Sequence, residues 1–422
     1  MSVSRDGVVV VGAGVVGLAS AHALAARGYR VTVIDRSPER RDGCSFGNAG
    51  MIVPSHFVPL AAPGMVWLGL TWMFDPESPF WIRPRLDRDL FAWGWRFLRA
   101  SNRRQVARAE PLLRDLNLAS RRCYEELADE TRGIGDFGLV KRGLLMLCRT
   151  ERGLEEEAHF AARANALGVP AEVLDAGQTA AADPGITMAV AGSVRFPLDA
   201  HLAPERFLAK LTAACRRLGV VFRWGTEVSR IRVTGRRIAA VESADAFDEA
   251  DHVVLAGGAW SPGLVRSLGL RLPMQAGKGY SLTLERPPQL PSLCSICTEA
   301  RLAVTPMDGR LRIGGTMEIA GLDERVDPRR VRGIIRSALA YFPGLREADF
   351  AGVEPWKGLR PCSPDGLPYL GRTARFDNLV IATGHAMMGL SLAPITGKLV
   401  GQLVAGERPD HDLALLSPDR YG

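Results

Sequence analysis

Three glycines and one aspartate near the start of the chain have the types and spacing needed to hold a dinucleotide. Gly12, Gly14 and Gly17 stand at GxGxxG spacing, and Asp35 follows a second apolar run. Gly12 permits a tight turn, Gly14 lets the backbone approach a pyrophosphate, and Gly17 allows close packing of a helix on a strand. A carboxylate at Asp35 can accept hydrogen bonds from ribose hydroxyls.

The flanking sequence supplies the elements that must position these residues. An apolar run at 8–11 precedes the glycines, a small-residue helical pattern follows them, and a second apolar run at 31–34 leads to Asp35. This order predicts a strand, a tight turn, a helix and a second strand. The helix N-terminus offers free N–H groups and a partial positive charge to a pyrophosphate.

Composition indicates a large globular protein of two domains. The chain has 422 residues, of which 47% are hydrophobic and 23% charged. Seven scattered cysteines argue against a disulfide framework and for a reducing compartment. We find no apolar leader and no uncharged run long enough to span a bilayer, so we expect a cytoplasmic protein.

Charge and cysteine spacing suggest two further kinds of partner, and we expect neither. The net charge of +7 comes almost entirely from arginine. Without a basic run interleaved with aromatic residues, it predicts a solvated surface and no nucleic-acid partner. Cys294 and Cys297 form a CxxC, but no second ligand pair follows, so we expect packing and no metal site.

Residues 65–100 are rich in tryptophan. Two interpretations stay open. The segment is either an amphipathic patch that touches the surface of a membrane, peripheral to the inner membrane, or a helical layer packed over the active site. We favour packing. The tryptophans concerned are Trp67, Trp72, Trp81, Trp93 and Trp95.

Glycine-rich segments recur in the middle and at the end of the chain. A nicotinamide dehydrogenase usually builds its site from one contiguous domain, whereas a flavoprotein can assemble one from separated segments. We therefore predict an α/β fold, with a discontinuous Rossmann-like FAD-binding domain and an α+β substrate domain built on a mixed antiparallel sheet. The predicted FAD-binding segments are 1–52, 197–265 and 355–422, and the substrate-binding segments are 53–196 and 266–354.

Within these domains the hydrophobic patterns predict individual elements. Helices are expected at 104–130, 151–167, 203–218 and beyond 391. Strands are expected at 143–148, 220–223, 228–233, 237–241, 270–286, 301–316 and 378–385, and within 251–260, where an apolar strand ends in Ala-Gly-Gly-Ala. Residues 43–65 are predicted to form an irregular loop, because they are rich in Gly, Pro and Asn.

Seven motifs, in this order along the chain, carry a resemblance to a known family. They are VVVVGAGVVGLASAHALAARGYRVTVID, SFGNAG, TEV, VLAGGAWS, GKGYSLTL, GLRPCSPDGLPYLG and ATGHAMMGLSLAPITGKLV. Together they resemble FAD-dependent D-amino acid dehydrogenases, within the wider superfamily of D-amino acid oxidase, glycine oxidase and sarcosine oxidase. The resemblance spans nearly the whole chain. The loop at 43–65 looks most like the branch that oxidises D-proline or D-hydroxyproline.

The resemblance implies a set of FAD-binding residues. The glycine cradle would hold the pyrophosphate, Asp35 the ribose, the SFGNAG loop the flavin end, and residues 384–390 the pyrimidine ring. The expected cofactor-binding residues are Gly12, Ala13, Gly14, Val15, Val16, Gly17, Asp35, Arg36, Ser45, Asn48, Ala49, Gly50, Val228, Ala256, Gly257, Gly384, Met387, Met388, Gly389 and Leu390. Gly358 stands where covalent sarcosine oxidases carry a cysteine, so we expect FAD to be bound non-covalently.

On the substrate side, the arginine of the GLRP motif makes a bidentate contact with the substrate carboxylate in relatives. That residue is Arg360 here, and Tyr280 would donate a hydrogen bond beside it. The alternatives are a structural salt bridge for Arg360 and a core position for Tyr280. Three further residues are candidates for the pocket, with a surface role for His56 and a backbone role for His385 as alternatives: Met51, His56 and His385.

The implied reaction is hydride transfer from the α-carbon of a D-amino acid to flavin N5, from a neutral amine and without an essential acid–base residue. Electrons would then pass to an unknown acceptor, a quinone or a protein. The alternatives are an oxidase of glycine, sarcosine or a 2-hydroxy acid on the same fold, and a non-catalytic flavin-binding subunit.

Overall fold

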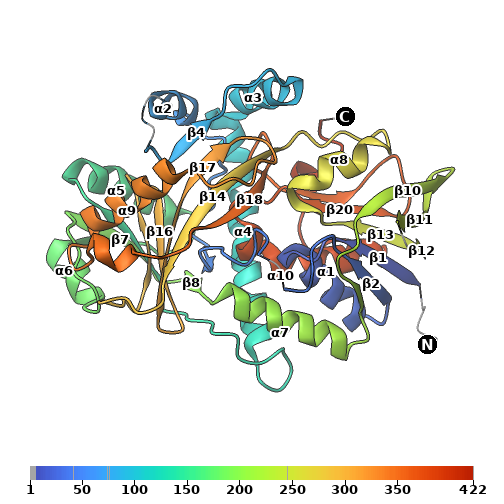
Figure 1. The fold of residues 1–422 in the computed structure, drawn as a ribbon, viewed down its shortest axis with the longest axis horizontal. Helices are drawn as coiled ribbons and strands as arrows, with labels where there is room; N and C mark the ends of the chain where they lie inside the picture. Colours follow the sequence, from blue (N-terminus) through green and yellow to red (C-terminus); the bar gives the residue numbers. More distant parts are fainter. Residues whose placement is uncertain (1–5, 41, 74, 76, 245, 422) are drawn as a thin grey trace.

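The computed structural model describes residues 6–40, 42–73, 75, 77–244 and 246–421, and two large sheets dominate it. Figure 1 shows one sheet in each half of the molecule. The six-stranded sheet has the order β19-β20-β13-β1-β2-β9. Its strands are β1 (Gly7–Val11), β2 (Arg30–Ile34), β9 (Val221–Arg223), β13 (His252–Leu255), β19 (Tyr369–Arg372) and β20 (Leu379–Thr383).

The core of the six-stranded sheet is parallel and buried on both faces. β1 pairs in parallel with β2 on one side and with β13 on the other, and β20 pairs in parallel with β13. Val8 to Val11 are all buried, as expected for a strand covered by helices on both faces. Segments from the beginning, middle and end of the chain therefore meet in one Rossmann-like sheet, as the sequence predicts.

The second large sheet is mixed and mostly antiparallel. Its nine strands follow the order β18-β14-β17-β16-β15-β5-β7-β6, with β4 paired to β17. β15 pairs in parallel with β5, and β17 with β4. The strands are β4 (Phe80–Ile82), β5 (Leu144–Cys148), β6 (Glu172–Asp175), β7 (Gly192–Phe196), β14 (Gln275–Leu284), β15 (Cys294–Cys297), β16 (Leu302–Met307), β17 (Arg310–Ile319) and β18 (Trp356–Cys362).

Two small sheets complete the strands. β10 (Val228–Thr234), β11 (Arg237–Ser243) and β12 (Phe247–Glu249) form one, and β3 (Met51–Ile52) pairs with β8 (Ala200–His201) in the other. β3 lies inside the segment 43–65 predicted to be an irregular loop. The stretch predicted at 301–316 divides into β16 and β17, because Asp308 and Gly309 both adopt positive φ in a tight turn between them.

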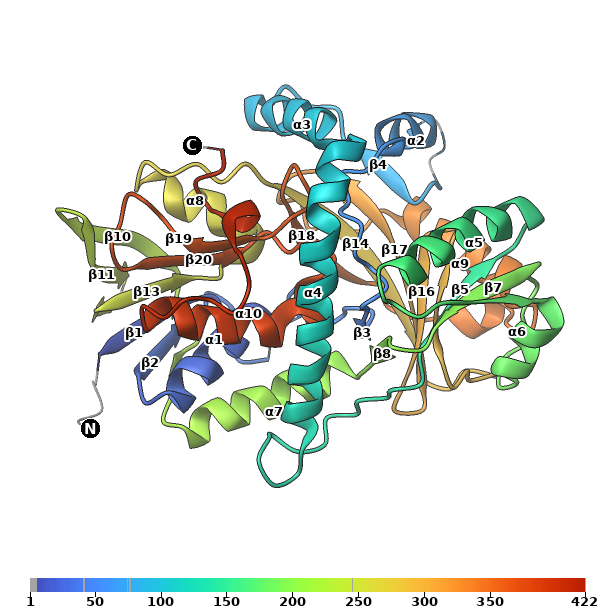
Figure 2. The ribbon, with the colours of Figure 1, turned by 180° about the vertical axis from the view of Figure 1, so that it is seen from behind.

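Helices cover both sheets and join the two halves. They are α1 (Val15–Ala26), α2 (Met65–Trp72), α3 (Arg88–Ala100), α4 (Arg103–Ala128), α5 (Glu151–Ala166), α6 (Ala176–Ala182), α7 (Pro204–Arg217), α8 (Ser261–Arg266), α9 (Pro328–Tyr341) and α10 (Gly389–Val404). Short 3₁₀ turns occur at η1 (Gly258–Trp260), η2 (Glu347–Phe350) and η3 (Ala414–Leu416). Figure 2 shows the long helix α4 passing between the halves and beside α10.

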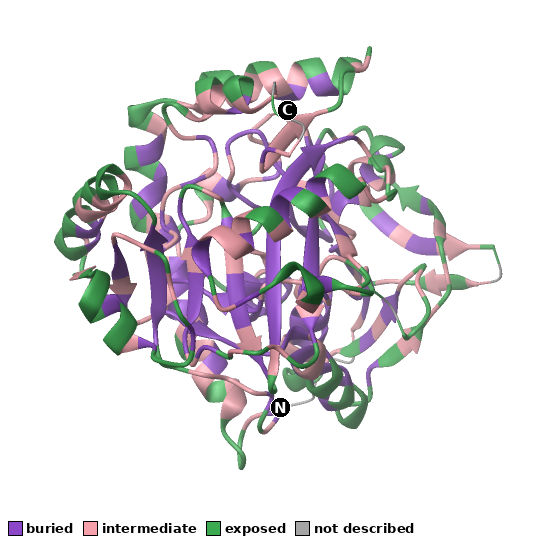
Figure 3. Ribbon diagram, turned by 60° about the vertical axis from the view of Figure 1, so that its left-hand side comes forward, coloured by how far each residue is buried: buried purple, intermediate pink, exposed green. Residues whose placement is uncertain are grey.

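Close helix contacts fix the start of α10. Tyr124 and Ser120 on α4 donate hydrogen bonds to the carbonyl oxygens of Leu390 and Ser391. A side chain at Gly397 would overlap the backbone of α1 at Ala19, so this glycine lets α10 and α1 pack tightly. Figure 3 shows the buried strands inside and the exposed helical faces outside.

One strand lies in a different sheet from its predicted segment. β18 falls within 355–422, which was assigned to the FAD-binding domain, yet it pairs with β14 in the nine-stranded sheet. The segment therefore contributes to both sheets, and the domain boundaries themselves stay a prediction.

Candidate active site

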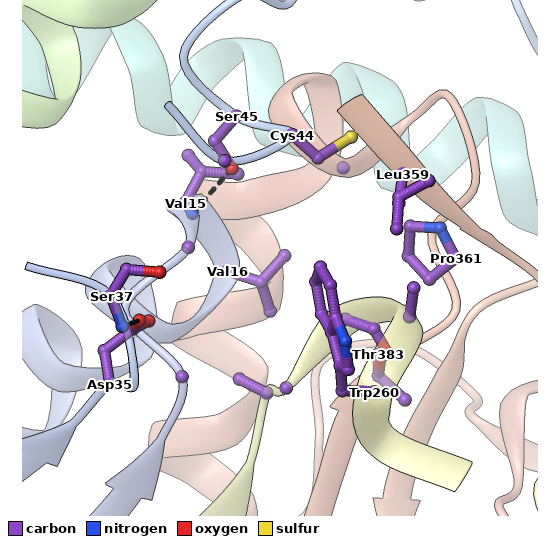
Figure 4. A pocket seen from close by; sticks show the side chains of 18 of the residues that line it. Val15, Val16, Asp35, Ser37, Cys44, Ser45, Trp260, Leu359, Pro361 and Thr383 are labelled. Carbon is purple, nitrogen blue, oxygen red and sulfur yellow. Dashed lines mark hydrogen bonds between the residues drawn. The ribbon is translucent and has the colours of Figure 1, made fainter. Parts of the chain in front are cut away.

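A long cavity of about 350 Å³ runs from the carboxyl edge of the six-stranded sheet to β18. Figure 4 shows Asp35 and Ser37 at one end, Val15 and Val16 between, and Leu359 and Pro361 at the other. Strand ends, the start of α1, the 43–48 loop and the start of α10 all contribute to its wall. An elongated ligand would therefore contact both sheets.

The glycines at the start of α1 are required by their surroundings. Gly12 has φ +106°, and a Cβ there would lie 2.5 Å from the carbonyl oxygen of Ala256. A Cβ at Gly17 would overlap the carbonyl oxygen of Gly12. Gly14 has no side chain to cap α1, and the Ser45 hydroxyl takes only the Val15 N–H, so the rest of the positive helix end faces the cavity, where a pyrophosphate could lie. This cradle fits the group that the sequence predicts.

Asp35 is held in position at the far end of the cavity. Its Oδ2 accepts a hydrogen bond from the Ala13 N–H at 2.6 Å, and its Oδ1 accepts one from the Ser37 N–H at 2.8 Å. Both bonds orient the carboxylate at the cavity wall, where ribose hydroxyls can reach its remaining lone pairs. Beside it, the Arg36 guanidinium lies 3.8 Å from the centroid of the Trp260 ring.

The 43–50 loop is tied to the nine-stranded sheet. Arg312 on β17 donates to the carbonyl oxygens of Phe46 and Asn48, each at 3.1 Å. Ser281 on β14 donates to the carbonyl oxygen of Gly47. The Ser45 hydroxyl, in turn, accepts a hydrogen bond from the Val15 N–H at 3.0 Å. These bonds hold the loop against the start of α1 and along the cavity.

Most of the expected cofactor residues line this cavity. Those on its wall are Gly12, Gly14, Val15, Val16, Asp35, Arg36, Ser45, Asn48, Val228, Ala256, Gly257, Gly389 and Leu390. Those not on its wall are Ala13, Gly17, Ala49, Gly50, Gly384, Met387 and Met388. Met387 is 45% exposed, so its side chain points away from the enclosed site. Ala13 and Gly17 act through the shape of the cradle.

Sequence reasoning missed several lining residues. They include Ser37, Cys44, Trp260, Pro361 and Thr383. Trp260 and Pro361 belong to the VLAGGAWS and GLRP motifs, which could have identified them as lining residues. Ser37 and Cys44 flank predicted residues but carry no spacing signal of their own.

Arg360 lies on β18 beside the cavity but is not part of its wall. Burial raises the pKa of the Cys44 thiol on that wall, and the positive charge of Arg360 opposes this. Its neighbours Leu359 and Pro361 line the cavity.

Side chains alternate along a strand, so Arg360 shares its face with Gly358, where a Cβ would lie 3.0 Å from the Cα of Cys44 on the cavity wall. On this face its guanidinium lies over Gly279 of β14, where any side chain would overlap it. Its Nη1 donates a hydrogen bond to the carbonyl oxygen of Thr316 at 2.6 Å.

The backbone beside Arg360 is strained. Thr316 has φ +64°, a conformation that β-branched residues rarely adopt. It lies where the pairing of β14 with β17 shifts register, which marks a bulge. The bulge aims the Thr316 carbonyl at Arg360. Within the described residues, the buried Thr316 hydroxyl has no hydrogen-bond partner.

Apolar side chains surround this face of the sheet. Met317 and Cys362 pack with Trp93 of α3 in one cluster, and the Trp93 indole N–H donates to the carbonyl oxygen of Cys362 at 2.9 Å. Burial raises the pKa of the Cys362 thiol to about 12, although the positive charge of Arg360 opposes this. The face thus combines one cation with apolar walls, as recognition of an amphipathic carboxylate requires.

The structure does not bring Tyr280 and Arg360 together. Tyr280 lies on the other face of β14, in the core beneath α9. Its hydroxyl donates to Glu318 Oε2 at 2.7 Å, and Lys278 Nζ lies 3.3 Å from the same oxygen. Burial, together with Glu318, raises the pKa of the Tyr280 phenol. The described geometry thus shows no contact between Tyr280 and Arg360, and their shared carboxylate site stays a prediction.

The three pocket candidates have different surroundings. His385 lines the cavity, and its Nε2 lies 3.1 Å from the Thr396 hydroxyl. His56 is not on the wall, and its Nδ1 lies 2.9 Å from the Ser55 hydroxyl. Burial lowers the pKa of each of these histidines to about 4. Met51 is buried in β3, opposite His201 of β8.

The CxxC pair belongs to the core of the nine-stranded sheet. Cys294 and Cys297 are fully buried in β15, and burial raises the pKa of both thiols. Over the described part of the chain, no group of three or more His, Cys, Asp or Glu side chains could hold a metal ion.

In the same residues, no helix has both the length and the apolar character needed to cross a bilayer.

Comparison with known proteins places this geometry in a wider context. A family model described as "FAD dependent oxidoreductase" matches residues 7–403. A D-amino acid dehydrogenase of Methylobacterium radiotolerans is 37% identical over 417 residues, covering 97% of this chain and 98% of the relative. One from Cereibacter sphaeroides is 38% identical over 427 residues, covering 98% and 95%.

Among solved structures, the glycine oxidase of Geobacillus kaustophilus superposes with a TM-score of 0.77. It is 27% identical and covers 99% of this chain and 100% of its own. The L-proline dehydrogenase of P. horikoshii has a TM-score of 0.75 at 18% identity, covering 99% and 98%, and shows the shared fold.

Proposed function

Because the chain belongs to the FAD dependent oxidoreductase family, we propose that it oxidises the α-amine of a D-amino acid whose carboxylate is held by Arg360. One observation carries the proposal. Arg360 is a half-buried cation on the strand that closes the cofactor cavity, and its guanidinium faces apolar side chains. The names of the relatives from Methylobacterium and Cereibacter support the substrate class.

The chain's own residues would hold FAD along the cavity without a covalent bond. The Gly12–Gly17 cradle takes the pyrophosphate, Asp35 takes the ribose, and the uncapped start of α10 faces the flavin end. When bound, FAD accepts the two electrons removed from the substrate. Cys44 lines the cavity, but burial raises the pKa of its thiol and keeps it protonated.

Arg360 can hold a carboxylate at two points. Its Nη1 is bonded to the Thr316 carbonyl oxygen, and in the described structure no other partner is found for its Nε and Nη2. A planar guanidinium matches the geometry of a carboxylate and fixes its orientation. The strained backbone at Thr316 holds the guanidinium in place before the substrate arrives.

Among the residues that the structure describes, we find no side chain at this face arranged as a general base. The Tyr280 hydroxyl is on the opposite face and bonded to Glu318, and His385 contacts Thr396. The substrate amine must therefore lose its proton to solvent before oxidation. We expect kcat/KM to rise with pH through the pKa of the substrate amine.

Among D-amino acids, we propose D-proline or cis-4-hydroxy-D-proline as the substrate. The support is the resemblance of the 43–65 loop to that branch. A compact ring also suits the narrow space at β14, the strand paired with Arg360. A Cβ at Gly277 there would lie 2.8 Å from the Met317 sulfur. We further propose that a quinone or a protein accepts the electrons, since the curated relatives are called dehydrogenases.

The test is anaerobic bleaching of the flavin with a panel of D- and L-amino acids, glycine, sarcosine and 2-hydroxy acids. Arg360→Ala should lower kcat/KM about 1,000-fold, which is the scale of losing two charge-assisted hydrogen bonds. Arg360→Lys should recover part of this loss. The matched control is Tyr280→Phe, which should leave kcat/KM within about twofold because that hydroxyl faces away.

Two results would overturn the assignment. One is unchanged kinetics in Arg360→Ala. The other is flavin that no amine or hydroxy acid bleaches, which would indicate a non-catalytic flavin-binding subunit. Bleaching by glycine or sarcosine alone would favour the second candidate function, an oxidase like the similar enzyme from Geobacillus.

A further inference from the structure

Arg312 on β17 is a buried cation that no step of the proposed reaction uses. It is 4% exposed, and each of its three nitrogens donates a hydrogen bond. Nε donates to the Thr283 hydroxyl at 3.0 Å, and Nη2 donates to the carboxylate of Glu205 in the first turn of α7. Nη1 donates to the carbonyl oxygens of Phe46 and Asn48, each at 3.1 Å. A buried guanidinium is costly unless its donors are satisfied, so the loop carbonyls help to hold it in place.

The carbonyl oxygens of residues 46–48 are all turned towards the nine-stranded sheet. Arg312 holds two of them, and the hydroxyl of Ser281 on β14 donates to the third, that of Gly47, at 3.1 Å. In a planar trans peptide group the N–H points in the opposite direction to the carbonyl oxygen. The N–H groups of residues 47–49 therefore point away from the sheet.

These three N–H groups need an acceptor. Within the described residues, the structure gives none of them a hydrogen-bond partner, although Gly47 is buried and Asn48 lies on the cavity wall. Figure 4 shows Cys44 of the same loop near Leu359, at the β18 end of the cavity. Buried backbone N–H groups are rarely left unpaired, and successive N–H groups that point one way attract negative charge. The loop therefore fits an acceptor-rich part of a bound ligand.

We propose that Arg312 is a positioning residue for FAD, which holds the loop carbonyls so that the N–H groups of residues 47–49 face acceptor atoms of the flavin. Arg312 itself does not line the cavity, so it acts through the loop. Hydrogen bonds from fixed N–H groups stabilise negative charge, and the flavin gains negative charge when it accepts electrons. Arg312 therefore favours bound FAD, and favours its reduced form most. The inference rests on the cofactor and not on the proposed substrate.

A second ion pair joins the same two elements without touching the loop. Arg206, next to Glu205 on α7, lies 2.8 Å from Asp308 in the turn between β16 and β17, and it also pairs with Asp136. The side chains of Arg206 and Asp308 are 39% and 41% exposed. Arg206→Gln removes this tie between α7 and the hairpin but leaves the bonds of Arg312 to the loop in place. It is the matched control for Arg312→Met.

The test measures FAD affinity and reduction potential in the FAD-loaded proteins, without turnover. Dilution followed by ultrafiltration gives the Kd, and reduction against a reference dye gives the midpoint potential of the flavin. Arg312→Met should weaken FAD binding by about tenfold or more, the scale of losing charge-assisted hydrogen bonds. Its midpoint potential should fall by about 30 mV, which is a further tenfold loss for reduced FAD in a two-electron couple. Arg206→Gln should match the parent protein in both measurements.

Two milder variants separate the role in the loop from a general loss of stability. Ser281→Ala removes only the bond to the Gly47 carbonyl oxygen, so it should shift the Kd and the potential in the same direction by a smaller amount. Arg312→Lys keeps the charge but loses the planar fork that holds two carbonyls, so it should recover part of the loss. Circular dichroism shows which variants are folded, and Ser281→Ala decides the test if Arg312→Met is not.

Three outcomes would overturn the proposal. The first is a midpoint potential equal to that of the parent protein in folded Arg312→Met. The second is an equal loss of FAD affinity in Arg312→Met and Arg206→Gln, because Arg312 would then serve only to tie α7 to β17. The third applies if Arg312→Met does not fold, and it is a Ser281→Ala variant with the Kd and the potential of the parent protein.

Discussion

The cofactor cradle can form only because residue 17 is a glycine and has no Cβ. A Cβ at Gly17 would overlap the carbonyl oxygen of Gly12, so Gly17→Ala should push α1 away from β1. We expect it to lower the free energy of unfolding by about 1–3 kcal/mol and to yield protein with little bound FAD. The ratio of flavin absorbance to protein absorbance after purification measures the second effect.

Gly263 provides the matched control. It is exposed in α8, and a Cβ there would meet nothing within 4 Å. Gly263→Ala should keep full FAD content and raise the free energy of unfolding by about 0.4–1 kcal/mol. Full FAD content in Gly17→Ala would contradict the steric argument.

For Arg360 and Tyr280, the sequence identifies the positions but does not say which face of the sheet each side chain takes. The GLRP and GKGY motifs identify both positions in the sequence. Which face each side chain takes depends on pairing: Arg360 stands opposite Gly277, and Tyr280 stands opposite Lys357. A shift of one residue in this register would reverse the faces. No local pattern in either strand fixes that register.

At the scale of elements, α3 combines both interpretations of the tryptophan-rich segment. Its inner face packs over β17 and β18, as the favoured interpretation expects, and its outer face is exposed. Both stripes have helical spacing, so periodicity alone could not say which one faces inwards. The position of α3 above Cys362 decides it.

Two tryptophans on this helix give a direct comparison. Trp93 is 5% exposed and bonded to Cys362, so Trp93→Ala should cost about 3–5 kcal/mol through a cavity and a lost hydrogen bond. Trp95→Ala should change stability by about 0.5 kcal/mol or less. Urea unfolding of both variants measures the difference. Equal losses would show that α3 does not dock by its inner face.

The sequence contains a recognisable signal for the turn between β16 and β17. Asp308-Gly309 is a dipeptide typical of tight hairpin turns, and both residues have positive φ. The sequence interpretation treated 301–316 as one stretch because apolar residues continue on both sides. By contrast, the bulge at Thr316 had no signal, since threonine is an ordinary strand residue.

At the scale of the whole molecule, buried histidines should make the protein sensitive to acid. Burial lowers the pKa of His56, His201 and His385 to about 4. The unfolded chain therefore binds these protons below about pH 6.5, and the folded chain does not. Stability should fall by up to about 1.4 kcal/mol per pH unit for each histidine between about pH 6.5 and 4.

The buried carboxyl of Asp199 has the opposite effect on the pH dependence of stability. Burial raises its pKa to about 7, so between about pH 4 and 7 the folded state holds a proton that the unfolded state releases. This single carboxyl makes the protein more stable as the pH falls through that range. Three histidines outweigh it, and the net expectation is a falling melting temperature.

Thermal unfolding from pH 7 to 4.5 tests this expectation. His201→Gln should make the slope shallower, because one buried histidine no longer takes up a proton on unfolding. A slope unchanged in His201→Gln would contradict the assignment.

The architecture of the molecule was largely predictable because its motifs are separated but ordered. Apolar strands ending in glycines recur at β1, β13 and β20, and these three share one sheet. The membership of β18 was not predictable. Its neighbour in the chain, β19, belongs to the other sheet, and only long-range pairing with β14 assigns it.

The order of strands in the six-stranded sheet also has a consequence for synthesis. β1 lies between β2 and β13, and the face of α1 is covered by α10 from the end of the chain. A nascent chain that has emerged only to β2 lacks both the strand beside β1 and the helix over α1. The cradle is completed when α10 leaves the ribosome and docks. FAD can bind only the completed cradle. A shortage of flavin should therefore shorten the lifetime of the folded protein and have little effect on the early folding of β1, α1 and β2.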